Sequence, residues 1–316
     1  MVKIVVFGDV MLDLYSLFLN KENPELRGAP GWKIREKQYL PGGAANVARN
    51  LVKLGSETVL VGRIGDDWAG EKLKKVLERE KINYYFDVDK RIQTTLKERI
   101  VHQDSGYYAG RKDDEGELVL AADGVNEILG DNLPLDVKSI PAVLENLVDC
   151  DAIIFSDYNK GMIIPELVQA VKAKGTLILA DIKPVHKDLF RGVYLVKPNS
   201  KEVREMTGIE DDIKAGERLT NELSTRILLT RGAKGMAYFC PRSGKMFELS
   251  TRAREVKDPV GCGDNVIATY AHFLFTREKP AKEAITLANI SAGIAAGHRG
   301  CYAPSEQEIF REIELG

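Results

Sequence analysis

Cysteines are few in this chain of 316 residues, and they lie far apart. Cys150, Cys240, Cys262 and Cys301 form no CxxC pair, which argues against both a disulfide framework and a zinc site. No run of about 20 apolar residues occurs, so no segment is expected to span a membrane as a helix. The first residues carry one short apolar run and no cleavage site, so a signal peptide is not expected. A reducing, cytoplasmic setting fits these absences best.

Neither sign of charge dominates. Lys and Arg number 45 and Asp and Glu 47, which gives a formal net charge of -2 with both signs mixed along the chain. A nucleic-acid-binding stripe or a polybasic membrane patch is therefore not expected. The motifs GxxxxGK[ST] and GxGxxG are both absent, so neither a Walker-type NTPase nor a dinucleotide-binding oxidoreductase is supported.

Short apolar runs alternate with helical patterns through the first two thirds of the chain. Runs typical of buried strands cover residues 2–7, 58–61, 152–155, 177–180, 193–196 and 227–229. Helical patterns cover residues 44–54, 69–80, 141–148, 165–173 and 201–206. The last third predicts a hairpin from residues 235–239 and 245–249, and then helices over 264–276, 281–297 and 305–313. This order predicts an α/β fold with a mostly parallel central sheet flanked by helices.

Two segments, residues 14–40 and 94–111, do not fit the alternation. They are polar, β-branched and aromatic, with turn residues between, so we expect short antiparallel strands outside the main sheet. The alternative is two long surface loops. Since no repeat or linker divides the chain, we predict one domain over residues 1–316, with a small β lid built from about 14–40 and 94–111.

A run of two glycines and an aspartate precedes the helical pattern at residue 264. Gly261, Cys262 and Gly263 allow the backbone to turn so that several N–H groups point at one place, and the helix start adds its positive dipole end. Such a site holds the negative charge that develops on a transferring γ-phosphoryl group. Asp264 beside it could accept the proton of an attacking hydroxyl. From spacing alone, an ordinary helix N-cap explains Asp264 equally well.

Other polar groups follow a glycine pair or a strand. Gly42 and Gly43 open a helix where a ligand can approach the backbone, and Asn46 offers a donor and an acceptor, although an ordinary turn into a helix would look the same. Asp13 follows the first strand, and ligands of open α/β sheets lie beyond such strand ends. Its alternative is a solvated loop carboxylate.

Two further strands are followed by residues suited to a nucleotide. Asn199 and Glu202 could orient water on Mg²⁺, or form a helix capping box, or do both. Thr230 and Gly232 lie in a glycine-rich turn and are candidates for contact with a phosphate or a ribose.

Taken together, these motifs resemble the ribokinase-like (PfkB) carbohydrate kinases over nearly the whole chain. The run Asp258-Pro-Val-Gly-Cys-Gly-Asp264 is similar to the C-terminal signature of that family, with Pro259 and Cys262 where Thr and Ala are usual. The run Pro41-Gly-Gly-Ala-Ala-Asn-Val-Ala48 resembles its N-terminal signature. The resemblance implies the ribokinase-like fold, ATP and Mg²⁺ as cofactors, and a catalytic base at Asp264.

The same resemblance implies roles for the remaining candidates. The anion hole would be formed by Gly261, Cys262 and Gly263, and the sugar would contact Asp13, Gly42, Gly43 and Asn46. The metal and the nucleotide would be held by Asn199, Glu202, Thr230, Gly232 and Asn289, the last in the helix that lines the adenine pocket.

Some runs resemble one branch of the family, the heptose 7-phosphate kinases. These are Ser156-Asp-Tyr-Asn-Lys-Gly161 and Asp181-Ile-Lys183. Bifunctional members of this branch carry an additional nucleotidyltransferase half, and the expectation here is a kinase only. The phosphate of a phosphorylated sugar needs cationic partners. The candidates are Lys160 and Arg111, then Lys97 and Arg99, while Lys183 is expected at the cofactor.

The sequence therefore predicts ATP-dependent phosphorylation of a sugar hydroxyl, at the 1-position of a heptose 7-phosphate. Two alternatives stay open. One is another kinase of the family, with ribose, fructose or a nucleoside as acceptor, and the other is a sugar-binding protein that has lost turnover. The resemblance also implies a homodimer, since exposed lid edges often pair in this family.

Overall fold

The computed structural model of the chain describes residues 2–22, 30–102, 125–128, 133–147, 149–241, 244, 246–253 and 256–315. Within these ranges the strands form two sheets, one of nine strands and one of four. None of the described helices combines the length and the apolar character that crossing a membrane requires.

The nine-stranded sheet is mostly parallel, as the alternation predicted. Its order is β13-β12-β11-β10-β9-β8-β1-β4-β5, and only β12 and β13 run antiparallel to their neighbours. The strands are β1 (Lys3–Gly8), β4 (Glu57–Ile64), β5 (Asn83–Val88), β8 (Ala152–Ser156), β9 (Leu177–Asp181), β10 (Leu195–Val196), β11 (Arg226–Thr230), β12 (Met236–Phe239) and β13 (Met246–Leu249). This confirms the α/β class.

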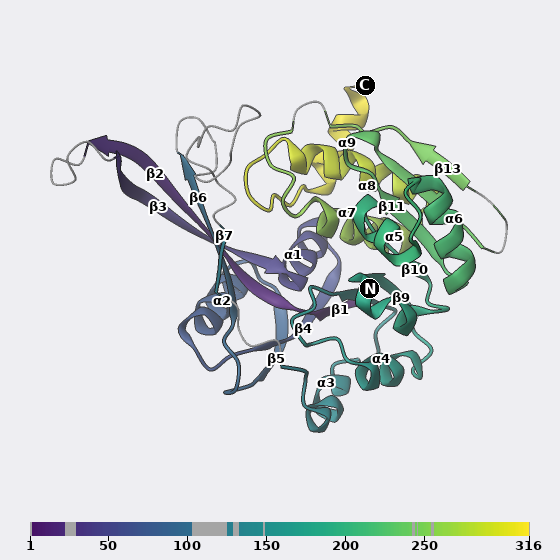
Figure 1. The fold of residues 1–316 in the computed structure, drawn as a ribbon, viewed down its shortest axis with the longest axis horizontal. Coiled ribbons are helices and arrows are strands. Elements are labelled where there is room, and N and C mark those ends of the chain that lie inside the picture. The colour runs from purple at the N-terminus through teal and green to yellow at the C-terminus, as the bar shows by residue number, and fades with distance from the viewer. Residues whose placement is uncertain are drawn as a thin grey trace.

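Helices cover both faces of this sheet (Figure 1). Successive residues of β1 point to opposite faces, so Ile4 and Val6 join one core and Val5 and Phe7 the other. The first face carries α1 (Ala44–Leu54), α2 (Trp68–Arg79), α7 (Cys262–Ala271), the π-helix η5 (His272–Thr276), α8 (Ala281–Ala296) and α9 (Glu306–Glu314). The second carries α3 (Ile140–Glu145), α4 (Pro165–Lys172), α5 (Ser200–Thr207) and α6 (Asp212–Leu223). Short 3₁₀ turns are η2 (Val137–Ser139), η3 (Pro184–Phe190) and η4 (Gly232–Lys234).

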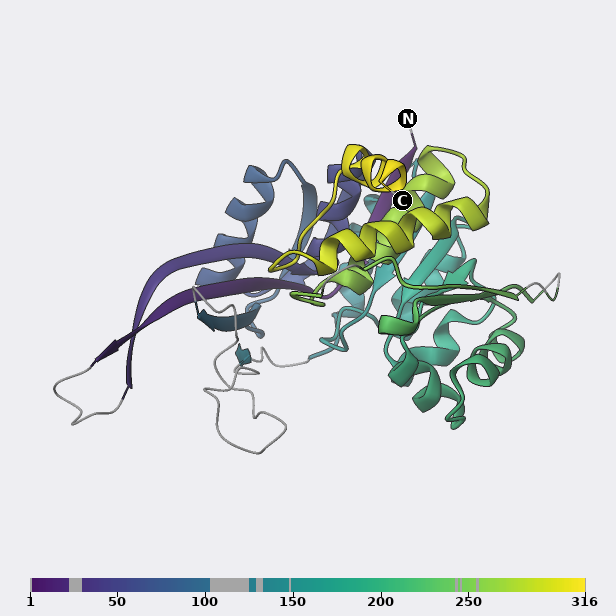
Figure 2. The same cartoon turned by 90° about the horizontal axis from the view of Figure 1, so that it is seen from above.

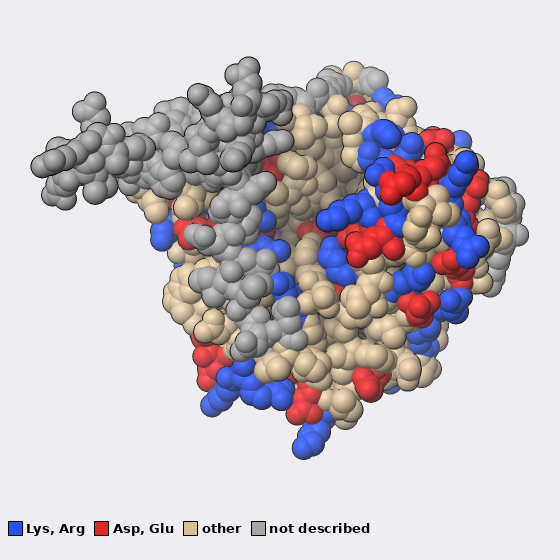
Figure 3. Space-filling view, in the orientation of Figure 1, with Lys and Arg blue, Asp and Glu red and all other residues tan. Residues whose placement is uncertain are grey.

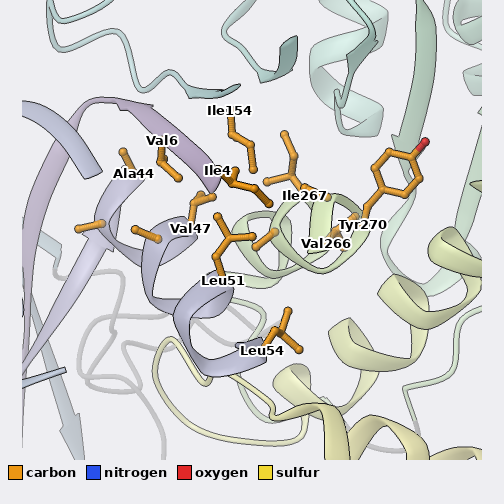
Figure 4. Close-up of a cluster of buried hydrophobic side chains, with 14 of the residues drawn as sticks. Ile4, Val6, Ala44, Val47, Leu51, Leu54, Ile154, Val266, Ile267 and Tyr270 are labelled. Atoms are coloured by element: carbon orange, nitrogen blue, oxygen red, sulfur yellow. The ribbon is translucent and has the colours of Figure 1, made fainter. Parts of the chain in front are cut away.

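The helices α1 and α7 pack against each other over β1 (Figure 4). Val47 and Leu51 of α1 meet Val266 and Ile267 of α7 in a fully buried cluster. Burial of such side chains is the main stabilising term for the pair. This packing also holds Asn46 and Asp264, which are 218 positions apart in the sequence, within hydrogen-bond distance of each other.

The second sheet has the order β3-β2-β6-β7, with β2 (Val10–Glu22), β3 (Pro30–Gly43), β6 (Thr95–His102) and β7 (Val125–Ile128). The β2–β3 ribbon extends away from the main body (Figure 2). The expected antiparallel strands outside the main sheet are present, because β2 pairs with β3 and β6 pairs with β7 in antiparallel fashion. The expectation is wrong about strand length, since β2 has 13 residues and β3 has 14, and it did not include the parallel pairing of β6 with β2. The pairing of β6 with β2 joins segments about eighty residues apart, and local patterns carry no information on its direction. The role of this sheet as a lid stays a prediction.

Candidate active site

The helix α7 begins at a glycine whose backbone is left-handed. Gly261 has φ 79°, and a Cβ at this position would lie 2.7 Å from Asn46 Nδ2 and 3.2 Å from Cys301 Sγ. Both the conformation and the space therefore require glycine. The same contacts show that the start of α7 lies directly against Asn46, on α1.

The turn before α7 is fixed by the Asp258 carboxylate, which accepts from the amides of Val260 at 3.0 Å and Gly300 at 2.9 Å. The first amides of a helix have no partner inside it, so this start offers N–H donors and the positive end of the dipole. The amide of Cys262 already donates to Pro259 O at 3.3 Å, so a bound phosphate would compete for it.

Asp264 lies in the first turn of α7 and is 4% exposed. The N-cap residue is Gly261 and no side chain caps this helix, so the interpretation of Asp264 as an N-cap is wrong. Its Oδ2 accepts from Asn46 Nδ2 at 2.9 Å and its Oδ1 from the Tyr158 hydroxyl at 2.8 Å. Burial raises the pKa of Asp264 to about 6, with the Asp181 charge acting in the same direction, while the two hydrogen bonds and Lys197 oppose the rise. A carboxylate with this pKa can be ionised at neutral pH and still be basic enough to take a proton.

Asp13 is buried where β2 leaves the main body, and it carries two contacts. Its Oδ1 is 3.0 Å from Arg99 Nη1 on β6, and its Oδ2 accepts from the Cys301 thiol at 3.3 Å. Gly42 on β3 approaches so closely that a Cβ there would lie 2.8 Å from Asp13 Cγ. The second sheet thus brings a carboxylate, a guanidinium and an open stretch of backbone to one point.

The four residues expected to bind the sugar lie around one position. Gly43 is the N-cap residue of α1 and lies three positions before Asn46. Gly42 pairs with Met11, which lies two positions before Asp13. Cys301 contacts Asp13 and lies beside Gly261, which in turn lies against Asn46. The acceptor-side and phosphoryl-side candidates therefore form a continuous surface.

Asn199 and Glu202 form a helix capping box, which was one of the alternatives considered from the sequence. Asn199 Oδ1 accepts from the Glu202 amide at 2.9 Å, and Glu202 Oε2 accepts from the Asn199 amide at 3.0 Å. Glu202 Oε1 is also paired with Lys183 Nζ at 2.7 Å. In the described residues no three His, Cys, Asp or Glu side chains are grouped to hold a metal ion.

Lys197 is buried and pairs with Asp181, with its Nζ 2.8 Å from Asp181 Oδ2. A Cβ on Gly263 would lie 3.3 Å from Lys197 Nζ, so this ammonium group lies beside the start of α7. Burial lowers the pKa of Lys197, but the charges of Asp181, Glu202 and Asp264 and the hydrogen bond to Asp181 together outweigh this and keep the pKa above its ordinary value. A permanent positive charge therefore accompanies the α7 amides.

Thr230, Gly232 and Asn289 belong to β11, η4 and α8 respectively. Thr230 ends β11, bridges to Asn199, and donates its amide to Pro198 O at 3.0 Å. Gly232 has φ 55° and open space around the position of a Cβ. Asn289 donates to Ser250 O at 2.7 Å, so its amide nitrogen already holds a backbone segment.

Of the four cations expected at a sugar phosphate, three lie in the described residues, and Arg111 lies outside them. Lys97 Nζ is 5.4 Å from the centre of the Tyr158 ring, and Arg99 is paired with Asp13. Lys160 belongs to the loop that carries Tyr158, with its amide 3.1 Å from Asp9 Oδ2. Figure 3 shows a hollow in this face of the molecule, with Lys and Arg side chains at its edge.

Sequence reasoning missed three of the side chains that meet here. Tyr158 contacts Asp264, which lies 106 positions later in the chain, and Cys301 contacts Asp13, which lies 288 positions earlier. Lys197 lies beside Gly263, at the start of α7. Each of the three follows a strand or a glycine, and Tyr158 also lies in the run Ser156-Asp-Tyr-Asn-Lys-Gly161 that resembles the heptose 7-phosphate kinases. A position after a strand or a glycine is shared by many residues with no role.

The model of the pfkB family of carbohydrate kinases matches residues 1–308, and the chain therefore belongs to this family. It is a carbohydrate kinase, a phosphotransferase with an alcohol group as acceptor. The chain is 34% identical over 322 residues to the bifunctional protein HldE of Pseudomonas fluorescens and 33% identical over 320 residues to that of Haemophilus influenzae. Each alignment covers 98% of this chain and 63% of the relative, so the chain spans less than two thirds of the length of these relatives.

Solved structures confirm the ribokinase-like fold. Phosphofructokinase-2 from Escherichia coli, in complex with potassium, superposes with a TM-score of 0.78 at 18% identity, over 100% of this chain and 99% of that chain. Ribokinase from Arabidopsis thaliana, complexed with ribose and ATP, gives a TM-score of 0.75 at 20% identity over 100% of both chains.

Proposed function

We propose that this kinase transfers the γ-phosphoryl group of ATP to a hydroxyl of a sugar phosphate, and that the acceptor is a heptose 7-phosphate phosphorylated at its 1-position. The observation that carries the first part is the buried Asp264 carboxylate, held by Asn46 at the start of a helix whose first amides and Lys197 supply positive charge. The second part draws on the runs that resemble heptose 7-phosphate kinases and on the similarity to HldE along 98% of the chain.

In the proposed step, Asp264 accepts the proton of the sugar hydroxyl as its oxygen attacks the γ-phosphorus. The bond from that phosphorus to the β,γ-bridging oxygen breaks, and ADP leaves with the bonding electrons. Negative charge spreads over the transferring group, where the amides of Gly261 and Gly263 and the Lys197 ammonium would oppose it. Asp13 and Asn46 would hold the hydroxyls of the sugar. Closure of the second sheet would exclude water as a competing acceptor.

ATP would lie along Asn199, Thr230, Gly232 and Asn289, with its phosphates toward Lys183 and the α7 start. Magnesium in kinases keeps several waters and binds through one or two carboxylates and the substrate phosphates. Both oxygens of Glu202 are already engaged, by Lys183 and by the Asn199 amide, so contact through a water fits this residue better than direct ligation. Bound there, the ion would neutralise charge on the phosphates.

The variant Glu202→Gln tests this assignment. Loss of the carboxylate charge is expected to raise the Mg²⁺ concentration for half-maximal activity about tenfold, in the range found when groups behind a metal site are changed. Glu205→Gln, an exposed residue of the same helix, is the matched control. If wild type and a folded Glu202→Gln variant show the same dependence of activity on Mg²⁺ concentration, Glu202 does not belong to the metal site.

A phosphorylated acceptor is favoured by the number of cations around Tyr158. Lys97 and Lys183 lie 5.4 and 5.5 Å from the centre of its ring, and Lys160 belongs to the same loop. Lys183 is paired with Glu202 and is proposed to face ATP, so Lys97 and Lys160 are the cations proposed to meet the phosphate of the acceptor.

Release of ADP, measured with a panel of acceptors, tests the proposed substrate. The panel holds a heptose 7-phosphate, fructose 6-phosphate, ribose, fructose and a nucleoside, and ³¹P NMR locates the new phosphate. We expect the highest kcat/KM with the heptose 7-phosphate and a product carrying its new phosphate on C1. Preference for ribose, fructose or a nucleoside would contradict the proposed acceptor but would still support a kinase. Sugar binding without ADP release from any acceptor would indicate a protein that has lost turnover.

Two further expectations concern the setting of the enzyme. We propose a cytoplasmic location, where ATP is supplied, and the four cysteines are free thiols as a reducing compartment requires. We also propose a homodimer formed through the edges of the second sheet, β3 and β7. Light scattering after gel filtration would reveal the dimer by its mass.

A further inference from the structure

The loop after β8 carries a tyrosine whose hydroxyl reaches the start of α7. The Tyr158 hydroxyl donates to Asp264 Oδ1 at 2.8 Å, while Asn46 holds Oδ2. We propose that Tyr158 is a positioning residue, which fixes the plane of the Asp264 carboxylate so that a free lone pair faces the reacting hydroxyl. This inference rests on the proposed function, in which Asp264 is the base.

The backbone around Tyr158 is itself firmly held. The buried Asp9 carboxylate, at the end of β1, accepts from the amides of Tyr158 at 2.7 Å, Lys160 at 3.1 Å and Met162 at 3.0 Å. Asp157 adds a second anchor, because its Oδ2 accepts from the Lys183 amide at 2.9 Å. A carboxylate that accepts several amides is a strong restraint on a loop. The tyrosine is thus presented from a fixed support.

The ring of Tyr158 has cationic neighbours from both sheets. Lys97, on β6 of the second sheet, and Lys183, after β9 of the main sheet, have their Nζ atoms 5.4 and 5.5 Å from the ring centre. Ammonium groups at this range are attracted to an aromatic face. They favour a single orientation of the ring, and hence a constant direction for the hydroxyl.

The charges facing Asp264 determine what the hydroxyl does to it. Asp181, at the end of β9, disfavours the ionised form, while Lys197, after β10, favours it. The buried Cys301 thiol also interacts with this carboxylate, and burial raises the thiol pKa well above its ordinary value, so it stays neutral. The hydroxyl of Tyr158 stabilises the carboxylate, so its removal must raise the pKa of Asp264 above its value of about 6.

The test compares Tyr158→Phe with Tyr270→Phe. Tyr270 is a buried tyrosine of α7 itself that makes no hydrogen bond to Asp264 (Figure 4). Activity requires the ionised base, so kcat/KM is lost as the pH falls through the pKa of Asp264. In Tyr158→Phe this acid limb is expected to move up by about one pH unit, which lowers kcat/KM about fivefold at pH 6. Tyr270→Phe should keep the wild-type limb.

A second readout does not depend on turnover. The pKa of Asp264 is followed by ¹³C NMR of the carboxyl carbon in protein labelled at aspartate, with Asp264→Asn used for assignment. An upward shift of the Asp264 pKa in Tyr158→Phe supports the role of Tyr158 even if no acceptor is phosphorylated. The absence of phosphorylation would count against the proposed function, not against the role of Tyr158. If a folded Tyr158→Phe variant, with wild-type melting temperature, leaves both the ¹³C titration and the acid limb unchanged, Tyr158 does not position Asp264.

Discussion

Replacing Asp264 by Asn is expected to lower kcat by roughly 10²- to 10⁴-fold, the range typical of a lost general base. The amide cannot take the proton of the attacking hydroxyl, although it has nearly the same size, its oxygen can still accept from Asn46, and its nitrogen can donate to the Tyr158 hydroxyl oxygen. The affinity for ATP should change little, because most of the residues proposed to bind the nucleotide lie outside α7, on β11, η4, α5 and α8, and the α7 amides remain in place. Steady-state kinetics and calorimetric titration with a non-hydrolysable ATP analogue measure the two quantities separately.

A control for this variant is Asp211→Asn, because Asp211 is a true helix N-cap, accepting from the amides of Ile213 and Lys214 at the start of α6. It should lose little stability, because Asn caps a helix about as well as Asp does, and no activity. Turnover of Asp264→Asn within a few fold of wild type would show that a different group takes the proton.

The second large effect is expected from Asp13→Asn, which should raise the KM for the acceptor about 100-fold and leave the KM for ATP nearly unchanged. A carboxylate that accepts sugar hydroxyls contributes about 1.5 to 3 kcal/mol for each hydrogen bond, and about 1.4 kcal/mol corresponds to a factor of ten. Asp13 is buried beside Arg99 and Cys301, where water screens such contacts poorly. Acceptor-dependent and ATP-dependent rates at saturating partner concentrations give both KM values.

Loss of the Asp13 charge also leaves Arg99 buried without its partner, which destabilises the fold by several kcal/mol in comparable cases. The double variant Asp13→Asn, Arg99→Met removes this uncompensated charge and should recover much of the melting temperature. Its acceptor KM should nevertheless remain high. An acceptor KM within about threefold of wild type, in a folded single variant, would exclude Asp13 from the sugar site.

The main sheet could be predicted because its buried strands are short apolar runs, and helices such as α4 follow them along the chain. The edge strand β5 was missed, since its side chains are only partly buried and its aromatic residues do not alternate with polar ones. The helix α6 was missed for a different reason. Gly216 weakens its helical pattern, yet a Cβ there would lie 2.4 Å from the Phe239 ring, so tertiary packing selects the glycine.

The candidate site was predicted only where a motif joins neighbouring residues. The run from Gly261 to Asp264 and the pair Gly42 and Gly43 could be read locally, because backbone turns depend on adjacent residues. The contacts that connect these motifs, such as Tyr158 with Asp264, depend on strand order in the sheet. No periodicity in the sequence specifies that order, which is why the contact of the Tyr158 hydroxyl with Asp264 could not be predicted before the fold was known.

A crystal structure of the chain with a non-hydrolysable ATP analogue and a heptose 7-phosphate examines the whole arrangement at once. The account predicts that the C1 hydroxyl oxygen lies within hydrogen-bond distance of the Asp264 carboxylate, with the γ-phosphate against the amides that start α7. A sugar hydroxyl directed to another base, or a γ-phosphate bound away from Gly261 and Gly263, would contradict it.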